Sequence, residues 1–121
     1  MKLILSLFTL LLCMYASANT YGDAECELVS VIDGDTIKCN IAGYPDIIGR
    51  EISVRFRGIN TPEIRGIERE QGLISRQKLI DILSDKQTIM LKDISRDKYF
   101  RIDADIYADG MKVNEASLLM P

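Results

Sequence analysis

The sequence predicts a mainly β protein with one long helix (the α+β class), folded as a five-stranded barrel with the helix between strands three and four. Three observations predict it. The dipeptide Asp33-Gly34 joins two β-branched runs, a third run alternates in polarity, and a helical pattern separates these from two further strand-like runs. Three strands, a helix and a closing pair form the element order of an OB-type barrel. The length of 121 residues fits a single domain.

The first three strands are predicted from β-branched residues and turn chemistry. Runs at 26–32 and 35–41 flank the Asp-Gly turn, and the Gly- and Pro-containing segment 42–49 is expected to be a loop. The run 51–57 alternates as a strand. Its two expected faces carry Ile52, Val54 and Phe56 on one side and Ser53, Arg55 and Arg57 on the other.

The second half begins with a turn at 60–63, because the residue before a proline disfavours helix. A helix is expected from about 65 to 83, where two apolar pairs at seven-residue spacing suggest its apolar face. These pairs are Ile67 with Ile74 and Leu73 with Ile80. Strands are expected at 88–91 and 102–107 around the polar segment 93–99, and a short helix at 113–120.

The N-terminus has the features of a secretory signal peptide. Lys2 precedes a Leu-rich run, and Ala16-Ser17-Ala18 fits the small-residue cleavage pattern. We expect residues 1–18 to be removed, leaving residues 19–121 as an exported domain, periplasmic or extracellular. We expect that domain to be a monomer with no stable membrane association. A membrane anchor or a lipoprotein at Cys13 fits less well, because the apolar run is short and Leu12 precedes that cysteine.

The composition restricts the chemistry. The chain has no histidine, which excludes Ser-His and Cys-His catalysis and histidine-ligated zinc. Lys and Arg number 15 against 18 Asp and Glu, so the chain is not a globally basic nucleic-acid binder. Catalysis would therefore depend on carboxylates, arginine, lysine, tyrosine or a hard metal ion.

Two cysteines, Cys26 and Cys39, remain after signal removal and lie on the two strands of the predicted hairpin with side chains on one face. Their predicted register is diagonal rather than directly opposite, which strains a disulfide. A disulfide and two half-buried thiols are therefore both open, in a compartment where disulfides persist.

Oxygen ligands and arginines gather near two turns. Asp33 and Asp35 flank Gly34, and Asn60, Thr61 and Glu63 follow the third strand, so two loops at a barrel mouth could supply the oxygens that Ca²⁺ requires. Arg55 and Arg101 add guanidinium groups, which bind phosphate and stabilise developing charge. A metal, a carboxylate base and two arginines are sufficient for phosphodiester hydrolysis without histidine. Each of these residues taken alone is more often an ordinary turn or surface residue.

Four ordered segments resemble the staphylococcal nuclease (thermonuclease-like) family over about 90 residues from Cys26 onward. They are VIDGDTI at 31–37, VRFRGINTPE at 54–63, RDKYFR at 96–101, and IYADG at 106–110 with VNEA at 113–116. The resemblance implies an OB-fold, Ca²⁺-dependent nuclease that cleaves DNA and RNA and leaves 3′-phosphate ends.

The resemblance also implies individual roles. Asp35 matches a calcium carboxylate, Asn60 the position of a second ligand, and Thr61 a residue that lends its backbone carbonyl. Glu63 matches the carboxylate that activates or positions water. Arg55 and Arg101 match the phosphate-binding arginines. Lys98 and Tyr99 match positions associated with nucleotide binding, while Asp33 is expected to be mainly a turn residue.

Three positions depart from the family pattern. Asn60 stands where Asp is common, Phe100 stands where Gly is usual, and the chain stops at Pro121, earlier than the family domain. Leu118, Leu119 and Met120 would help to cover the core only if they fold back. Two alternatives therefore stay open: a non-catalytic OB-fold module that binds single-stranded nucleic acid or a partner, and a truncated, inactive fragment.

Overall fold

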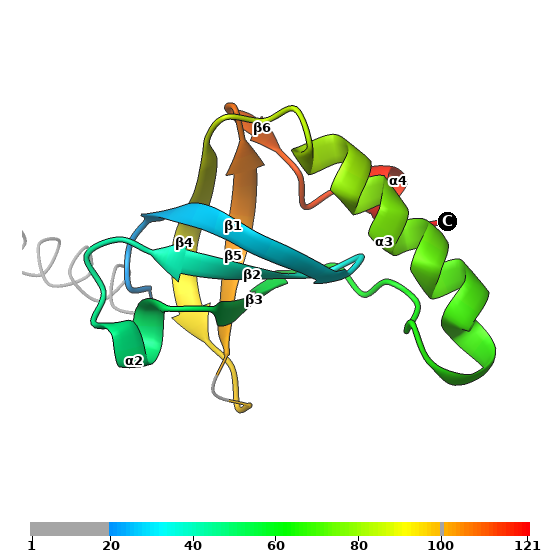
Figure 1. Cartoon of the computed structure of the whole chain (residues 1–121), viewed down its shortest axis with the longest axis horizontal. Coiled ribbons are helices and arrows are strands. Elements are labelled where there is room, and N and C mark those ends of the chain that lie inside the picture. The colour runs from blue at the N-terminus through cyan, green and yellow to red at the C-terminus, as the bar shows by residue number, and fades with distance from the viewer. Residues whose placement is uncertain (1–19, 100) are drawn as a thin grey trace, which may run out of the picture.

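The computed structural model describes residues 20–99 and 101–121, so the predicted signal peptide, 1–18, and Phe100 lie outside the described residues. Five strands form a closed mixed barrel with one long helix between the third and fourth, which confirms the predicted fold class (Figure 1). The elements are β1 (Ala24–Asp33), β2 (Thr36–Ile41), α2 (Asp46–Gly49), β3 (Ile52–Phe56), η1 (Gly66–Glu68), α3 (Arg69–Leu83), β4 (Ile89–Arg96), β5 (Ile102–Ala108), β6 (Met111–Lys112) and α4 (Ala116–Leu119).

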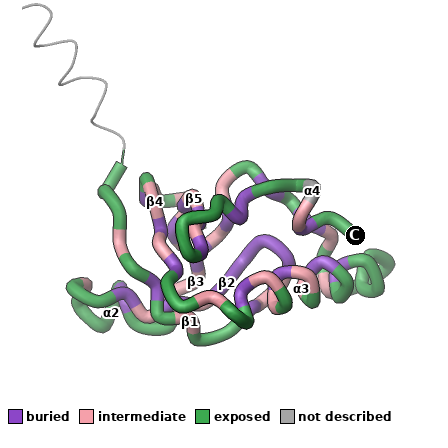
Figure 2. The backbone as a smooth tube through the Cα atoms, turned by 90° about the horizontal axis from the view of Figure 1, so that it is seen from above, coloured by how far each residue is buried: buried purple, intermediate pink, exposed green. Residues whose placement is uncertain are grey.

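Antiparallel pairs join β1 to β2, β2 to β3, β1 to β4 and β4 to β5, and a parallel pairing of β3 with β5 closes the ring. Closure removes the open sheet edges that would otherwise leave backbone groups unpaired. The two-residue strand β6 extends the sheet beyond β5. Buried positions recur along the strands (Figure 2), and Val54 and Phe56 of β3 are fully buried, on the face that the alternation predicts.

The apolar face predicted for the long helix is wrong at three of its four residues, whereas the fourth, Ile80, is half-buried and packs against the core. Ile67 lies in the short 3₁₀ segment η1 and is fully exposed, and Leu73 and Ile74 are both exposed. The buried face instead follows the spacing of three and four residues and consists of Gly72, Ser75, Leu79 and Leu83. Two of these four residues are small and one is polar, so hydrophobicity alone does not reveal this face.

Three boundaries also differ from the expectation. The segment expected to be a loop at 42–49 contains the short helix α2, and β4 continues through Arg96 into the segment expected to be polar loop. In the hairpin, Asp33 pairs with Thr36, so Gly34 and Asp35 form the two-residue tip and Asp35 stands outside the second strand. This places the Asp35 carboxylate at the end of the barrel.

The cysteines have the diagonal register that the sequence predicts. Cys26 lies opposite Ile41, and Cys39 lies opposite Leu28. The structure joins them by a disulfide with a Cα–Cα separation of 5.2 Å, within the ordinary range. The bond ties β1 to β2 inside the core.

The C-terminal residues fold back onto the long helix. Leu119 of α4 is fully buried, Leu118 packs against the core, and the Lys78 ammonium donates a hydrogen bond of 2.7 Å to the Met120 carbonyl. Met120 itself is exposed. Among the described residues, no helix is long and apolar enough to cross a bilayer.

Candidate active site

The Asp35 carboxylate connects the hairpin tip to the loop after β3. Oδ2 accepts a hydrogen bond of 3.0 Å from the Thr61 backbone N–H, and Oδ1 accepts one of 2.9 Å from the Thr36 hydroxyl. The Asp35 backbone carbonyl also accepts a 2.8 Å bond from the Phe56 N–H. Only 8% of the Asp35 side chain is exposed. Hydrogen-bond donors from two segments therefore compensate for the burial of this charged group.

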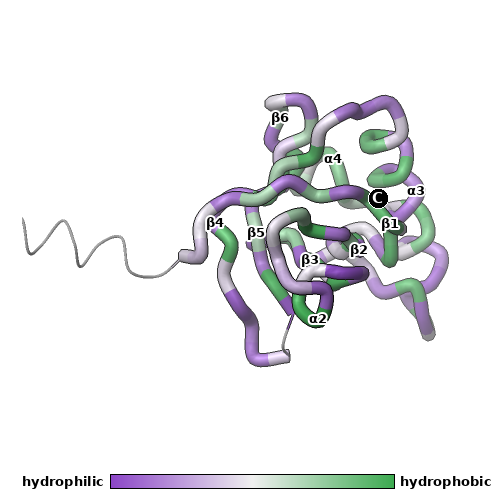
Figure 3. Tube along the Cα trace, turned by 60° about the vertical axis from the view of Figure 1, so that its left-hand side comes forward, coloured by the Kyte–Doolittle hydropathy of each residue, from purple (hydrophilic) through white to green (hydrophobic). Residues whose placement is uncertain are grey.

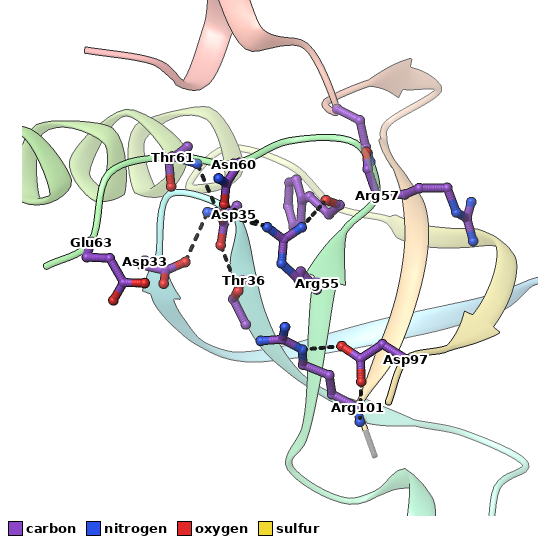
Figure 4. A network of polar contacts seen from close by, with 12 residues as sticks. Asp33, Asp35, Thr36, Arg55, Arg57, Asn60, Thr61, Glu63, Asp97 and Arg101 are labelled. Atoms are coloured by element: carbon purple, nitrogen blue, oxygen red, sulfur yellow. Dashed lines mark hydrogen bonds and ion pairs between the residues drawn. The ribbon is translucent and has the colours of Figure 1, made fainter. Parts of the chain in front are cut away.

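Arg55 faces the oxygens of both loops (Figure 4). Its Nη2 lies 3.0 Å from Asn60 Oδ1 and 3.7 Å from Asp35 Oδ2, and its Nη1 donates a 3.2 Å bond to the Phe56 carbonyl. An amide oxygen from one loop and a carboxylate oxygen from the other therefore converge on one cationic group. A second cationic group comes from the chain just before β5 and completes the cationic side of the site.

 Arg101, which directly precedes β5, is that further cation.

Arg101 is oriented by Asp97 at the other end of the β4–β5 connection. The two side chains form an ion pair through Arg101 Nε, and Asp97 Oδ1 also accepts the backbone N–H groups of Tyr99 (2.8 Å) and Arg101 (3.2 Å). Burial alone would raise the pKa of the Asp97 carboxyl, but these hydrogen bonds outweigh it and leave the pKa below its ordinary value. The ion pair raises the pKa of Arg101, and the carboxylates of Asp103 and Asp35 add to that effect.

The contacts of Arg101 leave much of its guanidinium for a ligand. Within the described part of the chain, its hydrogen bonds use Nε and the backbone N–H, while both Nη groups carry further donors. In Figure 4 this guanidinium extends from the Asp97 side toward Thr36, below Asp35 and Arg55. Arg55 on β3 and Arg101, just before β5, thus approach the same region from two segments of the chain.

Asp33 lies beside Asp35 and is more than a turn residue. Its Oδ1 accepts a 3.0 Å hydrogen bond from the Asp35 backbone N–H, a local contact typical of aspartate in turns. Burial, together with the neighbouring Asp35 side chain, raises the pKa of Asp33 to about 6. Burial therefore opposes the ionisation of Asp33, and a bound cation would stabilise its charged form.

Glu63 is exposed, and its position is set by the close approach of α3. Its backbone N–H donates a 3.0 Å bond to Glu68 Oε2. A Cβ placed on Gly72 would lie 2.2 Å from the Glu63 carbonyl oxygen, and one on Gly34 would lie 2.7 Å from Ser75 Cβ. Only glycine permits such contacts, so these two residues let the helix pack directly against both ligand-bearing segments.

Lys98 and Tyr99 are exposed on the β4–β5 connection, three and two residues before Arg101. The Lys98 ammonium lies 5.1 Å from the Tyr99 ring centroid, and the Arg101 guanidinium carbon lies 5.3 Å from it. The structure therefore groups both predicted nucleotide-binding residues with Arg101 but does not bring them to the Asp35 carboxylate. Phe100, the departure next to Arg101, lies outside the described residues.

Arg57 resembles Arg55 in sequence but is engaged in structural contacts. It forms an ion pair of 3.2 Å with Asp105 and donates hydrogen bonds to Ser95 Oγ and the Asp103 carbonyl. The Asn114 side chain bridges the Arg57 carbonyl (3.0 Å) and the Ile106 N–H (2.6 Å). Arg57 and Asn114 therefore join strands of the barrel rather than contribute to the site.

Sequence reasoning missed two acidic residues beside the arginines. Asp97 follows a local pattern that can be recognised in a sequence. Its carboxylate accepts the backbone N–H of Tyr99, two residues later, and pairs with Arg101, four residues later. Asp103 lies opposite Arg55 in the parallel β3–β5 pairing, and its buried Oδ1 has no hydrogen-bond partner among the described residues. Burial and the charge of Asp97 raise the pKa of Asp103. Its proximity depends on a strand pairing that no local pattern reveals.

The oxygen atoms at this site are of the chemical type that binds a hard cation. Among the described residues, no group of three or more cysteine and acidic side chains is arranged to hold a metal ion. Calcium, however, also takes amide and backbone carbonyl oxygens and water. Asp35, Asn60 and the Thr61 carbonyl would supply such oxygens, and the Asp33 carboxylate lies beside Asp35. No protein-family model matches the chain.

Proposed function

We propose that this protein is an exported, calcium-dependent nuclease that hydrolyses phosphodiester bonds of DNA, RNA or both. One observation carries the proposal: Arg55 bridges the Asp35 and Asn60 oxygens from two loops. Arg101, oriented by Asp97, approaches the same region. Acidic oxygens beside two guanidinium groups can bind a cation and a phosphate together. The resemblance to the staphylococcal nuclease family supports the same reading, and the predicted signal peptide at residues 1–18 supports export.

In the proposed reaction, Asp35, Asn60 and the Thr61 carbonyl would hold the cation, which would supply Lewis-acid stabilisation of a phosphate oxygen. Glu63 accepts a proton from the attacking water, whose oxygen forms a new bond to phosphorus. Arg55 and Arg101 donate hydrogen bonds to the non-bridging oxygens as their negative charge grows. The bond from phosphorus to the 5′ oxygen breaks, that oxygen takes a proton from solvent, and a 3′-phosphate and a 5′-hydroxyl result.

A kinetic comparison of single variants tests these roles. Single-stranded and double-stranded DNA and RNA are incubated with the purified protein and Ca²⁺, and initial rates are measured for Glu63→Ala, Arg55→Ala and the matched control Arg69→Ala. Arg69 is exposed at the start of α3 and takes no part in the site contacts described above. The first two variants should lose roughly 100-fold or more in rate, as loss of one charge-stabilising donor does elsewhere. Full activity in either variant would sink the mechanism.

A non-catalytic OB-fold module is the second candidate, and one observation favours it. Asn60 is neutral and already accepts a hydrogen bond from Arg55, so the cation site has one carboxylate fewer than the family pattern. Binding of nucleic acid without cleavage, at a Ca²⁺ concentration where calorimetry shows the metal bound, would select this candidate. The protein would then bind its ligand as a monomeric module rather than turn it over.

A further inference from the structure

The disulfide between Cys26 and Cys39 lies where four neighbouring strands of the barrel meet. Cys26 is paired with Ile41 of β2 and, on its other side, with Ile89 of β4. Cys39 is paired with β1 on one side and with Ile52 of β3 on the other. The bond therefore joins the two central strands of the run β3-β2-β1-β4 and fixes how they lie relative to each other.

The ladder between β1 and β2 is irregular from this bond to the hairpin tip. Six residue pairs join the two strands, but β1 uses the eight residues 26–33 for them, and in the described ladder Val29 and Ile32 lie opposite no residue of β2. An extra residue of this kind is a β-bulge, and the side chains beyond it change faces. Cys26 and Val31 are accordingly both buried, although strict alternation would place them on opposite faces. Two bulges therefore separate the bond from Asp35.

The apolar pattern of β1 specifies this register weakly. Positions 28, 29, 31 and 32 are all apolar, so a shift by one residue still offers an apolar side chain to the core. The tube is green beside the β1 label in Figure 3. Asp35, in contrast, needs one register, because its carbonyl accepts the Phe56 N–H and its carboxylate accepts the Thr61 N–H. The candidate site therefore depends on a register that the covalent bond secures better than the apolar pattern does.

Both sulfur atoms are shielded once the barrel has closed, because Cys26 is 5% exposed and Cys39 is fully buried. Such a bond forms by exchange with the disulfide of an external oxidant. The two cysteines lose their thiol hydrogens and become joined, and the oxidant's disulfide takes up two electrons and two protons and becomes two thiols. The bond must therefore form before the barrel closes, and a reductant reaches it only when the barrel opens. Reducing compartments keep thiols reduced, whereas the compartments that receive exported chains preserve disulfides.

We propose that the Cys26–Cys39 bond makes the candidate site conditional on oxidation: the oxidised chain holds the hairpin in the register that places Asp35, and the reduced chain does not. The inference rests on the proposed nuclease function and adds a regulation to it. A chain in a reducing compartment lacks the assembled site, and it acquires cation binding and nuclease activity only after export. Because the closed barrel shields the bond, this activation runs in one direction under native conditions.

The experiment compares two redox forms of the mature protein expected after signal removal, in which Cys26 and Cys39 are the only cysteines. The protein is unfolded in urea and refolded by dilution with either a reductant or oxidised glutathione. Calorimetry gives the Kd for Ca²⁺, and initial rates on single-stranded DNA give the activity. Hydrogen exchange of the β1 and β2 amides reports on the ladder without metal or substrate. The double variant Cys26→Ser/Cys39→Ser lacks the bond, and the control Leu83→Ala, at the buried end of α3, keeps the bond but loses stability.

The reduced protein should bind Ca²⁺ at least about tenfold more weakly, as when the support of a metal ligand is lost, and cleave roughly 100-fold more slowly. Its β1 and β2 amides should lose protection while those of β4 and β5 keep it. The double variant should match the reduced protein in both refolding buffers. Leu83→Ala should unfold at lower urea but keep its Kd and rate within about twofold of the oxidised protein. A reductant added to the folded, oxidised protein without urea should change none of these values.

Equal Ca²⁺ affinity and equal hydrogen exchange in the two redox forms would overturn the inference. Loss of protection throughout the barrel on reduction, or a Leu83→Ala variant that loses Ca²⁺ affinity as the reduced protein does, would show that the bond acts through global stability and not through the register. Failure of the nuclease proposal gives a different pattern: the oxidised protein cleaves nothing, while reduction still removes the protection of β1 and β2. Rapid loss of activity when a reductant meets the folded, oxidised protein would contradict the shielding of the bond.

Discussion

The substitution Gly72→Ala adds one methyl group at the contact between α3 and the loop that carries Glu63. The new Cβ would lie 2.2 Å from the Glu63 carbonyl oxygen, 2.5 Å from its carbonyl carbon and 2.8 Å from the Ile64 nitrogen. Ordinary van der Waals contact begins at 3.4 Å. All three neighbours are backbone atoms, which cannot rotate away as a side chain can. The helix and the loop must therefore separate by about 1.2 Å, the difference between these distances.

Two effects on stability oppose each other. Alanine in a helix interior is favoured over glycine by about 1 kcal/mol. Overpacking at a tight contact typically costs about 1–3 kcal/mol. The free energy of unfolding should therefore fall by about 1 kcal/mol. The effect on rate should be larger, because a displacement of about 1 Å in a positioned group can cost roughly 100-fold.

Urea unfolding and initial cleavage rates separate the two effects. The matched control is Gln71→Ala, an exposed neighbour on the same helix, which should leave both quantities within about 0.5 kcal/mol and twofold of wild type. Gly72→Ala should fold cooperatively and cleave far more slowly. A variant that is more stable than wild type and fully active would show that helix propensity alone governs this position, and the positioning role of Gly72 would be refuted.

Three further predictions concern contacts around the site and the core. Asp97→Asn should lower kcat roughly tenfold with little change in unfolding, because Arg101 loses its ion pair at a partly exposed position; an unchanged kcat would contradict this orienting role. Replacing Cys26 and Cys39 by serine should lower the free energy of unfolding by about 3 kcal/mol, as expected for a loop of this length, and a reductant should then have no further effect on urea unfolding. Because the folded-state pKa of Asp33 is raised from 3.8 to about 6, its protonated form stabilises the fold at low pH, and this stabilisation is lost as the pH rises through about 6. In chelator, Asp33→Asn should remove that loss between about pH 4 and 6, and an unchanged pH profile of unfolding would argue against it.

Much of the fold could be predicted because its signals are local. The Asp-Gly turn, the alternation of residues 51–57 and the diagonal register of the two cysteines all follow from period-two strands and turn chemistry. The helix face could not be predicted in the same way. Gly72 and Ser75 are buried because α3 packs against backbone, not because they are apolar. Exposed isoleucines at seven-residue spacing pointed to the wrong face.

The candidate site was predictable where its residues lie in short motifs and not where strand pairing brings them together. Asp35, Asn60 and Thr61 were expected from two oxygen-rich turns, and they do meet around Arg55. Asp103 reaches the arginines only through the parallel pairing of β3 with β5, which closes the barrel. The distinction between Arg55 and Arg57 is also tertiary, because Arg57 pairs with Asp105 on β5, a strand distant in sequence that lies beside β3.

The central claim is that a cation, carboxylates and arginines hydrolyse phosphodiesters in a chain without histidine. The most direct test is the cleavage of single-stranded DNA and RNA as Ca²⁺ is titrated in, removed with chelator and restored, with analysis of the product ends. The account predicts cleavage that appears with Ca²⁺, stops in chelator and returns, and products that carry 3′-phosphates. Cleavage that continues in chelator, or no cleavage when calorimetry shows Ca²⁺ bound, would contradict it.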